Sequence, residues 1–416
     1  MKRKLLKQIR SEWRSNLWMS LELLVVSVVL WYVVDYFYAT WYIYTEPKGF
    51  DTEHCYRLSF GHITDKNPDY IPDQQKDDLI KTNEEILRRM EQLPFVEAAS
   101  LSQNSFPYNG SNSGTYIFND SLSSSTLNYL LRRIATPGFP KVFRYEGIRG
   151  ETPEEISELM VKGEIILSGP VFGTGDDRLL PEAHIGEDFH LDGDTIHSYR
   201  LGAVLKDVRY GDFMDWNTSV LINLPHSWMS WSDEFCLRVR PEEDHDIPER
   251  LMEMANGYFH VGNRVLVNVI PFTDTRDRFQ QNNYDTIRDM VVMMGFLLLN
   301  IFLGLFGTFW FRTQQRAQEI AVRKSMGATP ADIFRRLITE GIVLLSIVTP
   351  LAFGIDCLLA YMEYNTYLMG SYFSVPRVLL CAAVTFGLIT LMIIAGVFFP
   401  ARRAQKIDPA IVLKDE

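Results

Sequence analysis

The residues best placed to do chemistry in this sequence lie in one short charged segment, 312–336, between two apolar runs. Glu319 and Arg323 stand four residues apart, so they can pair on one face of a helix, and Ile320 beside them offers an apolar contact. Gly327 can adopt the left-handed conformation that ends a helix. This pattern predicts ion pairing and contact with a partner rather than the making of bonds.

A second helix is expected directly after that glycine. Thr329 can cap it, Pro330 suits its first turn, and Asp332 places an acid near the positive end of the helix dipole. A helix, a sharp turn and a second helix that continues into a membrane span would form a lever. The alternative is an ordinary connecting loop whose charges only fix the topology.

The sequence shows no pattern for catalysis or for metal binding. Its eight histidines are scattered through residues 45–285, without the spacing of a metal motif. It contains no G-x-x-x-x-G-K-[ST] phosphate loop, so ATP and Mg would have to be bound by another chain. We expect no catalytic residue, no metal site and no cofactor in this chain.

Four apolar segments are long enough to cross a membrane, and they cover residues 17–44, 286–311, 337–361 and 377–399. About 20 helical residues span a hydrocarbon core of roughly 30 Å. The first segment is too long for the core of a cleavable signal, so we expect an uncleaved anchor that continues into a stalk. The predicted fold class is an α-helical membrane protein with four transmembrane helices and a large α+β extracytoplasmic domain.

Charge indicates the orientation of these spans. The chain has a formal net charge of −11, but the acidic excess lies in residues 45–285, whereas 1–16, 312–336 and 400–416 are basic. Basic flanks stay in the cytoplasm. Both termini are therefore expected in the cytoplasm, with residues 45–285 and the loop 362–376 on the opposite side of the membrane.

Residues 1–16 have the spacing of a basic amphipathic helix that lies on the membrane surface, although a plain topogenic flank explains them equally well. Every basic cluster of the chain abuts a span. We therefore expect the lipid bilayer, and no nucleic acid, as the partner of these clusters.

The polar segment alternates strand and helix patterns. Residues 50–104 and 232–272 each predict a strand, a helix and a strand, and 105–231 would be an inserted β-rich subdomain. Cys55 and Cys236 could form a disulfide if this domain faces an oxidising compartment. The expected strands cover 54–60, 96–101, 164–167, 189–191, 199–207, 219–224, 235–239 and 264–270, and the expected helices cover 74–93 and 247–255.

Carboxylates interrupt the apolar segments, where each costs several kcal/mol unless it is paired or hydrated. Glu22 and Glu340 lie within about two turns of the cytoplasmic surface, so we favour pairing with nearby arginines over a proton relay. Asp35 lies near the outer boundary. Asp356 lies deeper, where it could face a dimer partner, Asn300 or water from the outer side.

The run 319–328, EIAVRKSMGA, resembles the E-I-x-x-R-K-x-x-G-A signature of FtsX-like permeases, the membrane subunits of MacB-type (type VII) ABC transporters. Glu340 matches a glutamate typical of that family. The runs 400–404 and 407–410 resemble its P-A-R-R-A…D-P exit, and 184–208 is similar to its periplasmic-core pattern. The resemblance covers the whole plan of one span, a large outer domain and three spans.

The resemblance implies a non-catalytic subunit of the bacterial inner membrane, with both termini in the cytoplasm and residues 45–285 in the periplasm. This subunit would couple to a separate cytoplasmic ABC ATPase. It implies a homodimer or a heterodimer with a related permease, and a periplasmic adaptor and an outer-membrane channel would be further partners. Residues 50–104 and 232–272 would form its porter-like subdomain. The residues expected to couple to the ATPase are Glu319, Ile320, Arg323, Lys324, Gly327, Ala328, Asp332 and Glu340.

We therefore expect mechanotransmission, in which ATP hydrolysis by the partner reshapes the periplasmic domain and drives export or efflux. A lipoprotein-transport permease and a signalling or scaffold protein that regulates a periplasmic enzyme are the alternatives. A membrane-anchored periplasmic enzyme would need a nucleophile or a metal site that the sequence does not show.

Overall fold

The structure is a computed structural model that describes residues 13–72, 76–119, 129–172, 180–192, 194–214, 216–315, 317–362 and 374–405. The chain divides into a membrane unit, residues 1–44 and 283–416, and a sheet unit, residues 45–282. The predicted surface helix 1–16, apart from its last four residues, most of the loop 362–376 and residues 406–416 lie outside the described residues.

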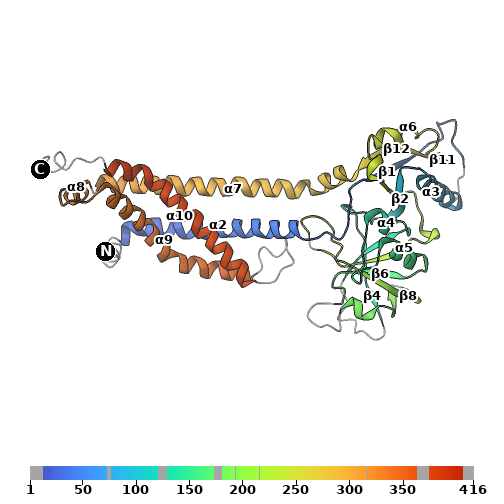
Figure 1. Cartoon of the computed structure of the whole chain (residues 1–416), viewed down its shortest axis with the longest axis horizontal. Helices are drawn as coiled ribbons and strands as arrows, with labels where there is room; N and C mark the ends of the chain where they lie inside the picture. The colour runs from blue at the N-terminus through green and yellow to red at the C-terminus, as the bar shows by residue number, and fades with distance from the viewer. Residues whose placement is uncertain are drawn as a thin grey trace. The chain divides into compact units, whose positions relative to one another are not determined.

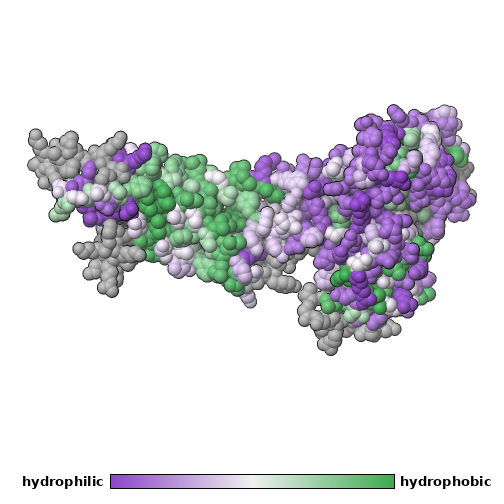
Figure 2. All heavy atoms as spheres, in the orientation of Figure 1, coloured by the Kyte–Doolittle hydropathy of each residue, from purple (hydrophilic) through white to green (hydrophobic). Residues whose placement is uncertain are grey.

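Long helices make up the membrane unit: α2 (Trp13–Thr45), α7 (Phe272–Gln315), which starts in the sheet unit, α9 (Pro330–Tyr361) and α10 (Val375–Gln405), with the short α8 (Ala317–Ser325) before α9. The four long helices are each long and apolar enough to cross a membrane. Figure 2 shows hydrophobic residues gathered over these helices and hydrophilic residues at the end where α8 lies. The predicted class of four transmembrane helices with an α+β domain is confirmed.

Apolar side chains from all four long helices meet inside the membrane unit. Trp31, Phe309, Leu344 and Ile393 are buried there and come from α2, α7, α9 and α10 respectively. Large apolar side chains such as Phe296 also cover the outer face of α7, as expected where lipid is the solvent. In Figure 1 the start of α2, α8 and the end of α10 lie at one end of this bundle, and the end of α9 and the start of α10 lie at the other.

The sheet unit contains the two predicted strand–helix–strand units. The first consists of β1 (Cys55–His62), α3 (Lys76–Glu91) and β2 (Val96–Gln103), and the second of β10 (Glu234–Val239), α6 (Ile247–Glu253) and β12 (Arg264–Pro271). The strands pair antiparallel in the order β12-β1-β10-β2, so the two units interleave. Leu58, Ile86, Leu237 and Leu251 bury one face of this sheet under the two helices.

The inserted segment extends the same sheet. Its strands continue from β2 in the order β5-β9-β6-β8-β7-β4, while β3 pairs with β5 and β11 pairs with β12 at the other edge. Two pairings are parallel, β5 with β9 and β6 with β8. The bounds are β3 (Gly114–Thr115), β4 (Ile117–Phe118), β5 (Leu130–Ala135), β6 (Ile165–Ser168), β7 (Asp188–Leu191), β8 (Asp194–Leu205), β9 (Ser219–Asn223) and β11 (His260–Val261), with helices α4 (Phe139–Phe143), α5 (Pro153–Val161), η3 (Pro181–His184), η4 (His226–Trp228) and η5 (Pro241–Glu243).

The sequence did not predict β5, α4 or α5. Strand β5 contains two adjacent arginines, and arginine side chains are rarely buried in a protein interior. Arg133 is nevertheless buried, because its guanidinium donates to the Ser105 carbonyl and to the Tyr145 hydroxyl. These bonds compensate part of the cost of burying the charge.

The suggested disulfide is not present in the structure. Cys55 and Cys236 are buried free thiols on the neighbouring strands β1 and β10. Burial raises the pKa of the Cys55 thiol to about 12 and also raises the pKa of the Cys236 thiol. Both thiols are therefore protonated and unreactive at neutral pH.

Candidate functional site

The charged segment forms a bent joint, which we call the elbow (residues 317–340). Helix α8 ends at Ser325, and Gly327 follows with a φ of +92°. The Ala328 N–H donates to the Arg323 carbonyl at 3.0 Å, and the Gly327 N–H donates to the Lys324 carbonyl at 3.0 Å. These bonds satisfy carbonyls at the end of α8, as in other glycine-terminated helices.

Helix α9 begins immediately after this turn with a capping box. The Asp332 N–H donates to the Thr329 hydroxyl at 3.2 Å, and the Thr329 N–H donates to the Asp332 carboxylate at 3.0 Å. Pro330 occupies the first turn. Such a box is worth about 1 kcal/mol to a helix start, so both sides of the elbow have defined ends and the predicted helix–turn–helix is confirmed.

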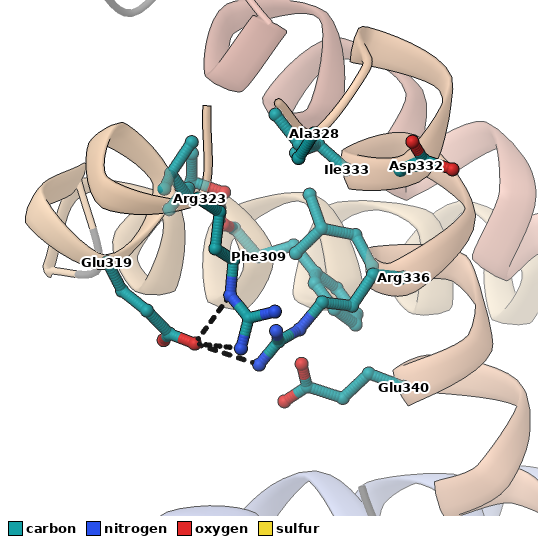
Figure 3. Close-up of a pocket in the computed structure, with 11 residues that line it drawn as sticks. Phe309, Glu319, Arg323, Ala328, Asp332, Ile333, Arg336 and Glu340 are labelled. Atoms are coloured by element: carbon teal, nitrogen blue, oxygen red, sulfur yellow. Dashed lines mark hydrogen bonds and ion pairs between the residues drawn. The ribbon is translucent and has the colours of Figure 1, made fainter. Parts of the chain in front are cut away.

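One carboxylate joins the two helices of the elbow. Glu319 Oε1 lies 2.9 Å from Arg323 on α8 and 2.9 Å from Arg336 on α9 (Figure 3). The spacing of the sequence predicted the first pair. It could not predict the second, because the two residues are 17 positions apart and meet only once the turn at Gly327 is formed.

A pocket with a cavity volume of about 80 Å³ lies in the bend of the elbow. Ile320 and Ala328 line it beside the charged groups, and Phe309 of α7 also contributes. Glu340 lines it too, is only 5 % exposed, and points its carboxylate toward Arg336 in Figure 3. Six of the eight predicted coupling residues line the pocket, whereas Lys324 on α8 and Gly327 in the turn after it lie outside the lining.

The outer side of the elbow offers a contact surface. Met326 is 83 % exposed and Val322 is also exposed, with Arg323 and Lys324 close by on the same helix. Large apolar side chains that are rimmed by charges mark contact sites more often than plain surface. The elbow can therefore present a basic and partly apolar surface to a partner.

A second cluster, which sequence reasoning missed, lies inside the sheet unit. We call it the root cluster (Lys48, Tyr108, Arg209, Asp212 and Arg276). Asp212 is 0 % exposed and accepts hydrogen bonds from Tyr108 at 2.7 Å and from Arg276 at 2.5 Å, while Lys48 lies 3.2 Å away. Lys48 follows α2 and Arg276 lies in the first turns of α7, so the cluster joins the two places where the chain enters and leaves the sheet unit.

Backbone contacts tighten the root cluster. Arg209 donates to the carbonyls of Glu46 at 3.0 Å and of Asp212 at 2.5 Å. Gly49 has a φ of +75°, and a Cβ there would lie 2.1 Å from the Asp207 carbonyl oxygen. The entering chain therefore passes directly against the loop after β8, with no space between them.

The root cluster keeps its carboxylate ionised. Burial alone would raise the pKa of Asp212, but the hydrogen bonds from Tyr108 and Arg276 and the charges of Lys48 and Arg276 hold this pKa below its usual value. No sequence pattern signals the cluster, because its members come from parts of the chain that are far apart. A buried acid between two bases is found only after the fold is known.

The carboxylates inside the membrane unit have different surroundings. Asp35 forms a bidentate pair with Arg377, with both N–O distances at 2.6 Å, which the sequence analysis did not anticipate. Glu22 lies against Gly304 of α7, and a Cβ at that glycine would be 2.1 Å from Glu22 Oε1. Asp356 lines a cavity with residues of α2 and α10, whereas Asn300 is exposed on α7 and is not part of that cavity.

Within the part of the chain that the structure describes, no group of three His, Cys, Asp or Glu residues is arranged to hold a metal ion.

Comparison with known proteins bears on the membrane unit. The model of the family described as "FtsX-like permease C-terminal" matches residues 291–409, which include α8, the elbow and the last two spans. No curated protein matches the chain. A solved structure, the extracellular domain of the noncanonic ABC-type transporter YknZ from Gram-positive bacteria, is 10 % identical and covers 51 % of this chain and 100 % of its own, with a TM-score of 0.30.

Proposed function

We propose that the chain is the permease subunit of an ABC transporter, and that it couples ATP hydrolysis by a separate cytoplasmic ATPase to movement of the sheet unit. The family match over residues 291–409 supports a permease. The observation that carries the coupling is the elbow, in which one carboxylate, Glu319, ties α8 to the helix that continues as a membrane span.

The steps follow from the geometry of the elbow. An ATPase that contacts the exposed side chains of Val322, on α8, and Met326, just after it, would push on the turn at Gly327. The capping box of α9 fixes the far side of this turn. Because α9 is a single helix from Pro330 to Tyr361, a displacement at its start is carried into the bilayer without an intervening loop. A rigid element of this kind can transmit a change between two states.

The proposed setting is a bacterial inner membrane, with the elbow in the cytoplasm and the sheet unit in the periplasm. The basic flanks of the spans support this orientation. Dimerisation with itself or with a related permease, and export through an adaptor and an outer-membrane channel, belong to the same proposal. The ATPase partner would bind ATP and Mg.

The test is reconstitution with the cognate ATPase. We expect the wild-type chain to co-purify with the ATPase and to stimulate its ATP hydrolysis, and we expect Glu319→Gln to lower the stimulated rate while the ATPase alone keeps its basal rate. Glu85→Gln is the matched control, because Glu85 also bridges two arginines but on the single helix α3. An unchanged stimulated rate in both Glu319→Gln and the double variant Glu319→Lys, Arg323→Glu would refute the coupling role of the elbow.

A further inference from the structure

A small cavity lies between α2, α9 and α10 in the membrane unit. It measures about 20 Å³, and the side chains of Ser27, Thr349, Asp356 and Thr385 bring oxygen atoms to an otherwise apolar lining. A space of this size holds about one water molecule. Asp356 lies five residues before Tyr361, the last residue of α9, which is about 8 Å along the helix axis.

Two oxygen atoms of this cavity have no hydrogen-bond partner among the described residues. They are Asp356 Oδ1 and Thr385 Oγ1, and each side chain belongs to a residue that is 4 % exposed. The Thr349 hydroxyl already donates to the Leu345 carbonyl at 2.8 Å, so it can only accept a further hydrogen bond. Buried polar atoms in proteins are nearly always bonded, so this pair indicates a missing proton or ligand.

Among the described residues that line the cavity, none carries a positive charge. Helix α2 brings Ser27, and α9 brings Asp356 itself with Cys357 next to it. On α10 the nearest base is Arg377, which is held by Asp35 in the bidentate pair, and Cys381 donates to the same Asp35 carboxylate at 3.6 Å. Among the described residues of α2, α9 and α10, none therefore supplies a counter-charge to Asp356.

A proton resolves both problems at once. An ionised and unpaired carboxylate within a membrane costs several kcal/mol, whereas a protonated one is neutral and gains an O–H donor. This donor can satisfy Thr385 Oγ1, either directly or through one water molecule. A metal cation fits less well, because hard cations take about six oxygen ligands and the four side chains offer fewer in a space for one small molecule.

We propose that Asp356 is a proton-binding site of the membrane unit, whose carboxyl group takes one proton from the solvent and donates it within the cavity to Thr385 or to a bridging water. The neutral carboxyl lets α2, α9 and α10 close around the cavity. The inference rests on the cavity and its unpaired oxygens, and it does not depend on the proposed transport function.

The test is infrared difference spectroscopy of the full-length protein in lipid nanodiscs at pH 7. We expect the wild type to show a C=O band of a protonated carboxyl group that is lost in Asp356→Asn, which keeps the shape of the acid. Thr385→Val should keep this band but shift its frequency, because the hydrogen-bond partner is gone. Glu22→Gln, which alters another carboxyl group of the same unit, should leave the band unchanged.

Three results would overturn the proposal. In the first, Asp356→Asn removes an ionised carboxylate band and no C=O band. In the second, the C=O band disappears when potassium is replaced by sodium at constant ionic strength, which would identify a sodium site. In the third, Thr385→Val leaves the frequency unchanged, which would show that the carboxyl group donates to Thr385 neither directly nor through a water molecule.

Discussion

The elbow and the root cluster are both built from one carboxylate between two bases, yet their surroundings differ. Glu319 is partly exposed and joins two helices at the surface of the membrane unit. Asp212 is completely buried and joins three segments inside the sheet unit. Each joint also has a glycine with positive φ, Gly327 in open space and Gly49 against a backbone carbonyl.

This difference separates a joint that can change from one that cannot. Exposed ion pairs contribute about 0–1 kcal/mol and exchange easily with water, so the elbow can open and close at small cost. Removing one partner of a buried pair costs about 3–5 kcal/mol. The elbow therefore suits a moving contact, whereas the root cluster suits a rigid attachment of the sheet unit to the segments that enter and leave it.

The largest effect is expected when Gly49, which follows Lys48 of the root cluster, is replaced by alanine. In Gly49→Ala the new Cβ would meet the Asp207 carbonyl oxygen at 2.1 Å, and the positive φ adds strain, so we expect a loss of more than about 3 kcal/mol. Gly327→Ala meets no atom within 4 Å and should cost only about 1 kcal/mol of backbone strain. Hydrogen exchange of the full-length protein measures both, and equal effects at the two glycines would contradict the comparison.

The second largest effect on stability is expected at Asp212, the carboxylate of the root cluster. Asp212→Asn leaves Lys48 and Arg276 without a counter-charge, and because these bases are about 30 % exposed and partly hydrated, we expect a loss of about 2–4 kcal/mol. Amide exchange at residues 205–214 should rise accordingly. Glu146→Gln, which breaks an exposed pair with Lys206, serves as the control and should have little effect. A small change in Asp212→Asn would show that the cluster is not structural.

The pH dependence of the same carboxylate follows from its lowered pKa. Because the folded state holds the pKa of Asp212 below its unfolded value, the stabilisation is present at neutral pH and is lost as the pH falls through the acid range, below about 4. The stability difference between the wild type and Asp212→Asn should therefore shrink on acidification. Urea unfolding of the full-length protein at pH 7, 5 and 3.5 measures this trend, and a difference that grows toward pH 3.5 would be inconsistent with it.

A smaller effect is expected at the elbow. The double variant Glu319→Lys, Arg323→Glu restores the pair within α8 but sets the new lysine against Arg336, so we expect the closed elbow to lose about 1 kcal/mol, or about fivefold in population. Adding Arg336→Glu restores both pairs and should recover part of the loss, because the new carboxylate also faces Glu340. Hydrogen exchange across α8 and the first turns of α9 reports on both variants, and a failure of the triple variant to recover would mean that Arg323 or Arg336 acts on a partner directly.

The smallest effect is expected at Glu85. Its carboxylate bridges Arg88 and Arg89 on α3, and the hydrogen bonds from these arginines lower its pKa to about 2. Both pairs lie on one exposed helix, so Glu85→Gln should change the free energy of unfolding by no more than about 0.5 kcal/mol. If Glu85→Gln lowered the free energy of unfolding by more than about 1 kcal/mol, an ion pair within one helix would matter as much as the pair between helices at the elbow.

Local signals predicted much of this architecture. The four spans, the two strand–helix–strand units and the capped turn at Gly327 and Thr329 follow from apolar periodicity and capping residues, which depend on neighbours in the sequence. Strand β5 was missed because its arginines find partners only in the folded state. The sequence also suggested a cysteine pair that the structure does not contain.

Contacts between distant segments were not predictable. Asp212 finds Lys48 and Arg276, Asp35 finds Arg377, and Glu319 finds Arg336 only after the chain has folded. A single sequence shows that a charge is present but not which charge will face it. The placement of the elbow residues next to one another was predictable because the turn at Gly327 is local.

The account depends most on the claim that movement at the elbow reaches the sheet unit. The direct measurement is hydrogen exchange across the sheet unit, residues 45–282, in the complex with the ATPase, with and without a non-hydrolysable ATP analogue. We predict a nucleotide-dependent change there in the wild type that is lost in Glu319→Lys, Arg323→Glu and recovered when Arg336→Glu is added. A nucleotide-dependent change that is the same in all three proteins, or absent from the wild type, would contradict the account.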